Sequence, residues 1–220
     1  MLEQLVADAR ADENVVGLVV HGSRGRGVFV TEQSDLDVIV VVRELRGTYG
    51  GGHGDALDAA EVTSLTRLPD WMLPALLWAE PAVDKTGEVA EQLRAVTTAD
   101  PATAAEPLDG YVNMLYRALK DARVGNELAA LLDAQESIPW LLHFLFNVHG
   151  RIRPYNKWLE WELREHPLPV AVDLDLLRRA GRGEVAAQRE QFVAAERIAR
   201  DAGLGAVIDG WEPDVAWLRG

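Results

Sequence analysis

Two aspartates separated by a single residue offer the clearest chemistry in this 220-residue chain. Asp35 and Asp37 enter an apolar run, LDVIVVV from Leu36 to Val42, which predicts a strand. Because side chains alternate along a strand, both carboxylates should lie on one face, close together. Carboxylates that close repel each other unless a cation lies between them. Oxygen-only ligands suit Mg²⁺, which takes one or two carboxylates and completes its coordination with phosphate oxygens.

A glycine-rich turn precedes the two aspartates. The apolar run from Val15 to Val20 predicts a buried strand that stops at Gly22-Ser23. The backbone N–H groups of such a turn can donate hydrogen bonds to a phosphate chain, as can the Ser23 hydroxyl and the guanidinium of Arg24 or Arg26. A phosphate-binding turn and a metal-binding pair therefore lie within one short stretch of sequence.

The elements that must position these residues form a small α/β unit. Apolar spacing predicts a helix over residues 1–12, and a third, weaker strand is expected from about Ala56 to Ser64. A helix over 73–80, an edge strand over 81–84 and a helix over 88–94 follow. The segment Thr97 to Pro107 is rich in Ala, Thr, Asp and Pro, and is the best candidate for a linker.

Beyond this linker every periodic stretch is helical. One helix should pass through residues 108–119, a second should start at a Ser137 cap and end at Gly150, and a third should cover 184–202. The predicted fold class is α+β, with a mixed-sheet domain over residues 1–100 and an all-α helical bundle domain over residues 106–220.

Gly22-Ser23 followed by Ser34-Asp35-Leu36-Asp37 resembles the signature of the DNA-polymerase-β-type nucleotidyltransferase superfamily. The motif covers 16 residues. The wider architecture is similar to that of its aminoglycoside (streptomycin or kanamycin) branch. The resemblance implies an enzyme that holds two Mg²⁺ ions, takes ATP as co-substrate, transfers AMP to a hydroxyl and releases pyrophosphate. Asp35 and Asp37 would then be metal ligands, and the turn from Gly22 to Arg26 would bind the nucleotide.

The superfamily uses a third carboxylate on a neighbouring strand, and two residues compete for that role. Asp58 and Glu61 are three apart, so on a regular strand only one of them can join the metal face. Asp58 is favoured as metal ligand and catalytic residue, because it lies early in the expected strand. Glu61 resembles the catalytic glutamate of the streptomycin branch. Asp84 is a weaker candidate and is expected to be a turn residue before Gly87.

A second cluster, residues 149–158, gathers basic and aromatic side chains in an acidic protein. Tyr155 could stack on a base, and Lys157 or Arg153 could meet phosphates. The structural alternative is that these residues cap helices, pack the bundle and pair with acids such as Glu160 and Glu162.

The amino-acid composition indicates which classes of partner the protein could bind. The formal net charge of −13 disfavours nucleic acid and anionic membranes and favours a cationic acceptor. Glu160, Glu162, Asp173 and Asp175 are available to recognise amines. Cysteine is absent, no apolar run is long enough to span a membrane, and no secretory signal is found, so a cytoplasmic location is expected.

Two other functions stay open at this point. One is adenylylation of a protein partner, as in toxin–antitoxin pairs; the other is a degenerate member that binds nucleotide without turnover. The sequence leaves open the acceptor, its relation to antibiotic resistance, the nucleotide preference and the oligomeric state.

Overall fold

The computed structural model describes residues 2–44, 68–69 and 71–220, and the backbone of residues 54–58. The chain divides into two compact units, Met1–Thr98 and Ala99–Gly220. The first unit contains a sheet, and every described element of the second is helical. The α+β fold class predicted from the sequence, a small mixed sheet followed by a helical bundle, is therefore confirmed.

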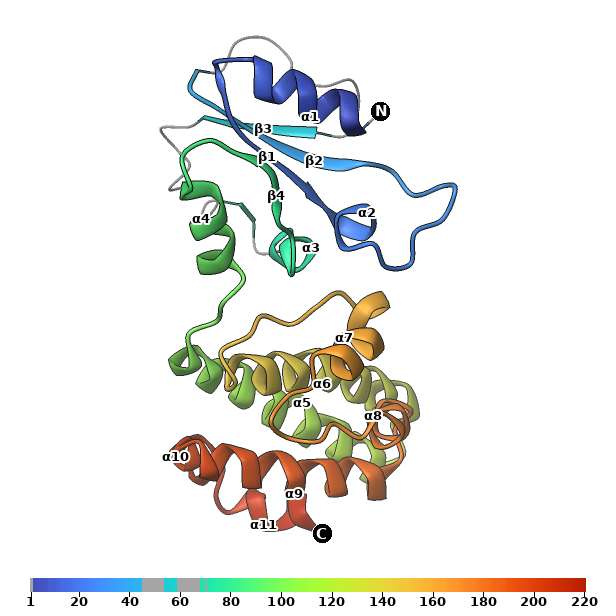
Figure 1. The fold of residues 1–220 in the computed structure, drawn as a ribbon. Helices are drawn as coiled ribbons and strands as arrows, with labels where there is room; N and C mark the ends of the chain where they lie inside the picture. The colour runs from blue at the N-terminus through green and yellow to red at the C-terminus, as the bar shows by residue number, and fades with distance from the viewer. Residues whose placement is uncertain (1, 45–53, 59–67, 70) are drawn as a thin grey trace. The chain divides into compact units, whose positions relative to one another are not determined.

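The first unit is built on a four-stranded mixed sheet with the order β3-β2-β1-β4 (Figure 1). Strand β1 is antiparallel to β2 and to β4, whereas β2 and β3 are parallel. In chain order the elements are α1 (Leu2–Ala11), β1 (Val15–His21), α2 (Gly22–Arg26), β2 (Asp37–Val42), β3 (Gly54–Asp58), α3 (Leu73–Leu76), β4 (Pro81–Asp84) and α4 (Glu88–Val96).

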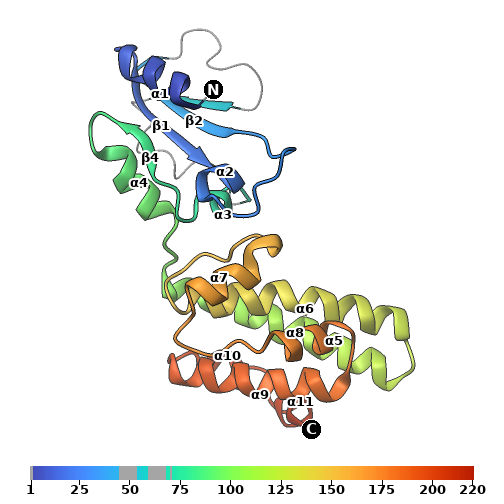
Figure 2. The same cartoon turned by 45° about the vertical axis from the view of Figure 1, so that its right-hand side comes forward.

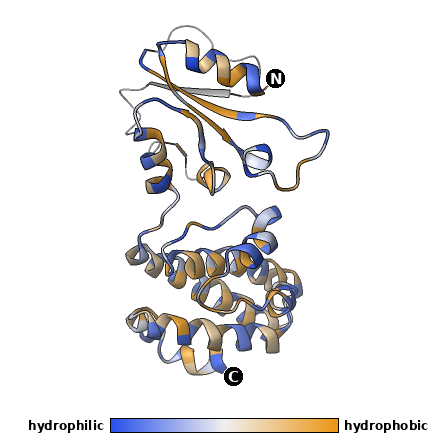
Figure 3. Cartoon of the chain, in the orientation of Figure 1, coloured by the Kyte–Doolittle hydropathy of each residue, from blue (hydrophilic) through white to orange (hydrophobic). Residues whose placement is uncertain are grey.

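Strands β1 and β2 are apolar because both of their faces are covered (Figure 3). Leu18 and Val40 belong to a cluster that also contains Ala9 of α1. Val19 and Ile39, which alternate with them, belong to a second cluster with residues of α4. The sheet is thus sandwiched between α1 and α4, which explains why the strand sequences lack a polar face.

The turn from β4 into α4 is organised by Asp84. Its Oδ1 accepts the backbone N–H of Gly87 at 2.7 Å, and its Oδ2 accepts that of Ala90 at 3.0 Å. Asp84 is therefore a turn residue that satisfies N–H groups at the start of the helix, as the sequence predicts.

The second unit is a helical bundle in which α5, α6 and α9 lie alongside one another (Figure 2). Its large buried side chains include Tyr111, Phe144 and Phe192. The α-helices are α5 (Ala105–Arg123), α6 (Glu127–Asn147), α7 (Leu159–Glu165), α8 (Leu174–Gly181), α9 (Val185–Asp201), α10 (Gly205–Asp209) and α11 (Asp214–Arg219). Among the described residues no helix is long and apolar enough to cross a membrane.

Several predicted boundaries are wrong. Helix α6 starts at Glu127, and Ser137 lies inside it, where its hydroxyl donates to the carbonyl of Ala134 at 2.7 Å. The division between the two units, after Thr98, falls within the expected linker, although a 3-10 helix covers Pro101–Ala104 and α5 follows at once. Helix α3 has only four residues, Leu73–Leu76. Strand β3 covers Gly54–Asp58, and the remainder of the strand expected up to Ser64 lies outside the described residues.

Candidate active site

The two halves of the sequence motif meet at one end of the sheet. Antiparallel pairing of β1 with β2 places His21 opposite Asp37, so that the chain enters α2 beside the first residue of β2. A Cβ atom added to Gly22 would lie 2.5 Å from Oδ2 of Asp37. No side chain fits there, and the backbone of Gly22 has a φ of 66°, which glycine adopts without strain. The glycine therefore lets the turn lie directly against the carboxylate.

Asp37 is half-buried and Asp35 is exposed, one residue outside β2. Leu36, between them, packs into the cluster on the α1 side of the sheet. The next strand residue after Asp37 on its own face is Ile39, which packs on the α4 side. These two carboxylates supply the oxygen donors that Mg²⁺ prefers. Among the described residues no group of three His, Asp or Glu side chains gathers closely enough to hold a metal.

Asp58, the favoured candidate for the third carboxylate, is not brought to this end of the sheet. Asp58 pairs with Val42 at the far end of β2, five residues from Asp37, or roughly 16 Å at the usual strand rise. Asp58 is thus the last described residue of β3, at the end of the sheet remote from Asp37. Asp55, which the sequence analysis overlooked, pairs with Ile39 and has its backbone nearer to Asp37. Glu61 lies outside the described residues.

The arginines of the turn make structural contacts. Arg24 donates through Nε to the carbonyl of Ser34 at 2.8 Å, which ties the 28–36 loop back to α2. Arg26 donates to the carbonyls of Pro74 at 3.2 Å and Leu77 at 2.7 Å. Arg26 therefore fastens α2 to α3, a role that the phosphate-binding prediction did not foresee. Ser23 is half-buried within α2, and its carbonyl accepts the N–H of Val28 at 3.2 Å.

In the helical unit the predicted nucleotide contacts pack on Trp158. The ring of Tyr155 lies 5.5 Å from that of Trp158, and the Lys157 ammonium lies 4.7 Å from the same ring. Trp158 is buried, so both neighbours contribute to the packing of the unit. Burial lowers the pKa of Arg153, and burial together with Arg153 lowers the pKa of His143.

The acids suggested for amine recognition mostly have structural partners. Glu162 is fully buried and pairs with Arg151, which also donates to the carbonyl of His166 at 2.6 Å. Asp173 caps α8 by accepting N–H groups from Asp175 and Leu176. Glu160 pairs with Arg178. The structural alternative stated above, pairing with the 149–158 cluster, therefore holds for Glu162, whereas the partner of Glu160 lies outside that cluster.

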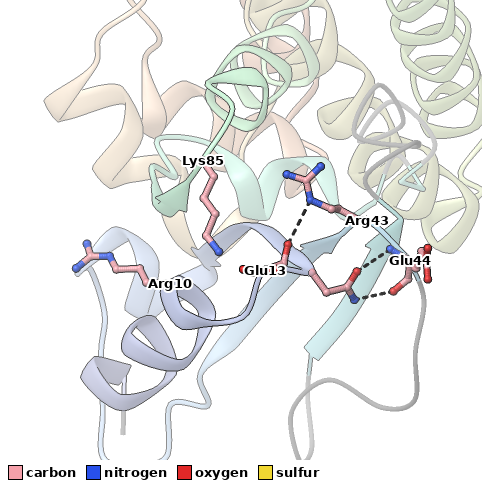
Figure 4. Close-up of a pocket in the computed structure, with 6 residues that line it drawn as sticks. Arg10, Glu13, Arg43, Glu44 and Lys85 are labelled. Atoms are coloured by element: carbon pink, nitrogen blue, oxygen red, sulfur yellow. Dashed lines mark hydrogen bonds between the residues drawn. The ribbon is translucent and has the colours of Figure 1, made fainter.

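A pocket of about 600 Å³ lies at the other end of the sheet from Asp37 (Figure 4). Asn14 precedes β1 there, and its side chain exchanges two hydrogen bonds with the backbone of Glu44, at 2.8 and 3.0 Å. Arg43 and Lys85 donate to the carbonyls of Glu13 and Asp12. None of the motif residues Gly22–Asp37 lines this pocket, which is separate from the candidate site.

No protein-family model matches the chain, and no curated protein matches it. Among the solved structures that are similar is a nucleotidyltransferase-like protein from Exiguobacterium sibiricum 255-15, with 11% identity, 90% of this chain and 77% of that chain covered, and a TM-score of 0.41. A likeness this distant says nothing about the activity of the present chain, so the functional argument rests on the site itself.

Proposed function

We propose that this protein is a Mg²⁺-dependent nucleotidyltransferase that moves AMP from ATP to a hydroxyl of a small cationic acceptor and releases pyrophosphate. The observation that carries the proposal is the contact between the Gly22 backbone and the Asp37 carboxylate. It joins a turn with donors for phosphate to a carboxylate suited to a metal bound to that phosphate.

Five residues of the motif have a proposed role. Asp35 and Asp37 would hold the metal ions, and the backbone of Gly22 with the Ser23 hydroxyl would donate to the triphosphate. Arg24, which is exposed, would add positive charge at the rim. Bound Mg²⁺ would supply charge neutralisation and a lower pKa for the acceptor hydroxyl.

The proton of the acceptor hydroxyl needs a base, and three carboxylates are candidates. Asp58 and Glu61 come from the sequence analysis, and the register of β3 adds Asp55. Asp55 pairs with Ile39, which is only two residues along β2 from Asp37, so we favour Asp55 over Asp58. Comparing Asp55→Asn, Asp58→Asn and Glu61→Gln would identify the base: only its loss should lower kcat by about 10²-fold or more.

A cationic acceptor is proposed because acidic side chains outnumber Lys and Arg in both units. Such a field attracts cations, while the metal offsets the charge of ATP. Two alternatives remain to be distinguished by experiment. One is adenylylation of a protein side chain, and the other is nucleotide binding without turnover.

The test measures pyrophosphate release by the full chain with ATP and Mg²⁺ across hydroxyl-bearing amines, aminoglycosides included. Release should require an acceptor and should fall by about 10²-fold or more in Asp37→Asn, since a neutral amide binds Mg²⁺ poorly. Glu32→Gln is the matched control, because Glu32 is an exposed acid of the same loop. Release that persists in Asp37→Asn would contradict the metal site. ATP binding without release would favour the degenerate alternative.

A further inference from the structure

A groove of about 290 Å³ runs between the α3–β4 connection and α4 in the first unit. One wall is the segment 78–81, which leads into β4, and the other is a face of α4. Figure 1 shows β4 between α3 and α4. The groove is mainly apolar, and its lining residues are Leu76, Trp78, Ala79, Glu80, Pro81, Ala90, Leu93, Arg94 and Thr97.

This groove lies at the same end of the sheet as the candidate active site. Pro81 pairs with Val19, and β4 is antiparallel to β1, so the residues before Pro81 extend toward the end of β1 where Gly22 lies. Leu76 and Leu93 belong to the cluster that contains Ile39, on the face of the sheet that Asp37 shares. The groove and the motif are thus neighbours within one unit.

Trp78 is the most unusual residue of the groove. Its φ of 63° is in the left-handed region, which a bulky side chain rarely adopts, yet its side chain is 48% exposed. Arg26 holds the preceding carbonyl of Leu77, and the N–H of Ala79 is bonded to the carbonyl of Leu76 at 2.9 Å. Strained backbone that its surroundings enforce occurs most often at ligand sites. The fold therefore fixes an exposed indole beside the groove instead of burying it.

The charges of the groove indicate what it could hold. Glu80 lies on the wall of Trp78 and Arg94 on the wall of α4. Both side chains are exposed, and within the described part of the chain neither has a hydrogen bond or an ion pair. An indole face next to a free carboxylate attracts a flat ring with an ammonium group. The guanidinium on the opposite wall disfavours further positive charge.

We infer that this groove is the acceptor subsite of the proposed transferase and takes a flat ring bearing a single protonated amine. The ring lies on Trp78, the ammonium binds Glu80, and Arg94 selects against polycations. This inference rests on the proposed function and narrows its acceptor from cationic molecules in general to ring compounds with one amine.

Binding is tested on the full chain without ATP or Mg²⁺, by NMR titration with benzylamine, with benzyl alcohol as the uncharged analogue and p-xylylenediamine as the dication. Benzylamine should bind at least about fivefold more tightly than benzyl alcohol, and the dication should bind no more tightly than benzylamine. Arg94→Gln should improve binding of the dication. Equal affinities for benzylamine and benzyl alcohol, or no saturation by benzylamine, would overturn the inference.

Two variants and two matched controls locate the site. Glu80→Gln should remove the preference for benzylamine, whereas Trp78→Asn should weaken the binding of both benzylamine and benzyl alcohol; asparagine is chosen because it tolerates the left-handed backbone. Trp71→Asn and Glu91→Gln should leave the preference intact, because Trp71 is 69% exposed and Glu91 is exposed on α4, and neither lines the groove. Equal losses in the controls would place the binding elsewhere.

The experiments can reject the acceptor subsite and the proposed transferase activity independently of each other. Failure of pyrophosphate release would remove the proposed function, while the titrations would still report binding in the groove. If AMP is transferred to the hydroxyl of a ring compound that also carries one amine, Glu80→Gln should raise the KM for that acceptor about fivefold or more and leave the KM for ATP unchanged. An unchanged acceptor KM would overturn the subsite and leave the transferase standing.

Discussion

At the scale of single residues, the site depends on positions where the side chain and the backbone must fit together. Gly22 and Asp37 lie fifteen positions apart in the sequence, and the pairing of β1 with β2 brings them into contact. Ser137 shows the opposite case: its type indicated a helix cap, but it lies inside α6 and its hydroxyl bonds within that helix. Arg26 donates to the carbonyls of Pro74 and Leu77, contacts that the motif did not indicate.

Gly22→Ala should destabilise the first unit by about 2 kcal/mol and weaken Mg²⁺ binding. The added methyl would meet the Asp37 carboxylate at 2.5 Å, in addition to the strain of a positive φ. Gly27→Ala is the matched control, because Gly27 has a similar φ of 68° but no atom within 4 Å of its added Cβ. Urea unfolding and Mg²⁺ titration measure both effects. Equal results for the two variants would show that backbone strain alone matters.

At the scale of elements, ion pairs connect helices of the second unit to one another. Arg151 follows α6 and meets the fully buried Glu162 of α7. Glu196 of α9 accepts from Arg200 at 2.9 Å and from Arg219 of α11 at 2.8 Å. The sequence predicted α9 well from its apolar spacing, but it did not reveal which of the many charged residues form these pairs.

Glu162→Ala should lower the free energy of unfolding by about 3 kcal/mol, because it leaves the Arg151 guanidinium partly buried without its carboxylate. Chemical unfolding followed by circular dichroism measures the loss. The exposed pair of Arg164 and Glu165 provides the comparison: Glu165→Ala should cost less than about 1 kcal/mol. Similar losses in both variants would show that burial of the first pair does not matter.

The Glu196 carboxylate predicts a pH dependence of stability. Hydrogen bonding by Arg219, followed by that of Arg200, lowers the pKa of Glu196 although burial opposes the shift. A carboxyl with a lower pKa in the folded state stabilises the fold above its unfolded pKa, and this contribution is lost as the pH falls through the folded pKa. Glu196→Gln should therefore be less stable than the parent at pH 7, and the difference should shrink as the pH falls through the folded pKa of Glu196. Glu136→Gln, which removes an exposed acid on α6, should be as stable as the parent at pH 7.

At the scale of the whole molecule, the net charge of −13 acts on every approaching ion. Salt screens the long-range attraction between this net charge and a cation. The short-range contact expected between an ammonium group and Glu80 is screened less. The Kd for benzylamine should therefore rise about twofold to fivefold between low and high NaCl, and that for benzyl alcohol should stay constant. Calorimetric titration at the two salt concentrations checks this. A Kd for benzylamine that does not change with salt would assign the attraction to local contacts alone.

The sequence by itself determined the strands that carry the motif, the carboxylate pair and the helical character of the second half. These are local patterns: apolar runs, alternation and helical spacing are all present in the order of residues. Only the tertiary structure decided that Gly22 lies against Asp37, that Glu162 is buried with Arg151, and that Asp58 lies at the far end of its strand from Asp37. The reason is that strand register and the pairing of distant charges depend on packing between elements, which no short stretch of sequence encodes.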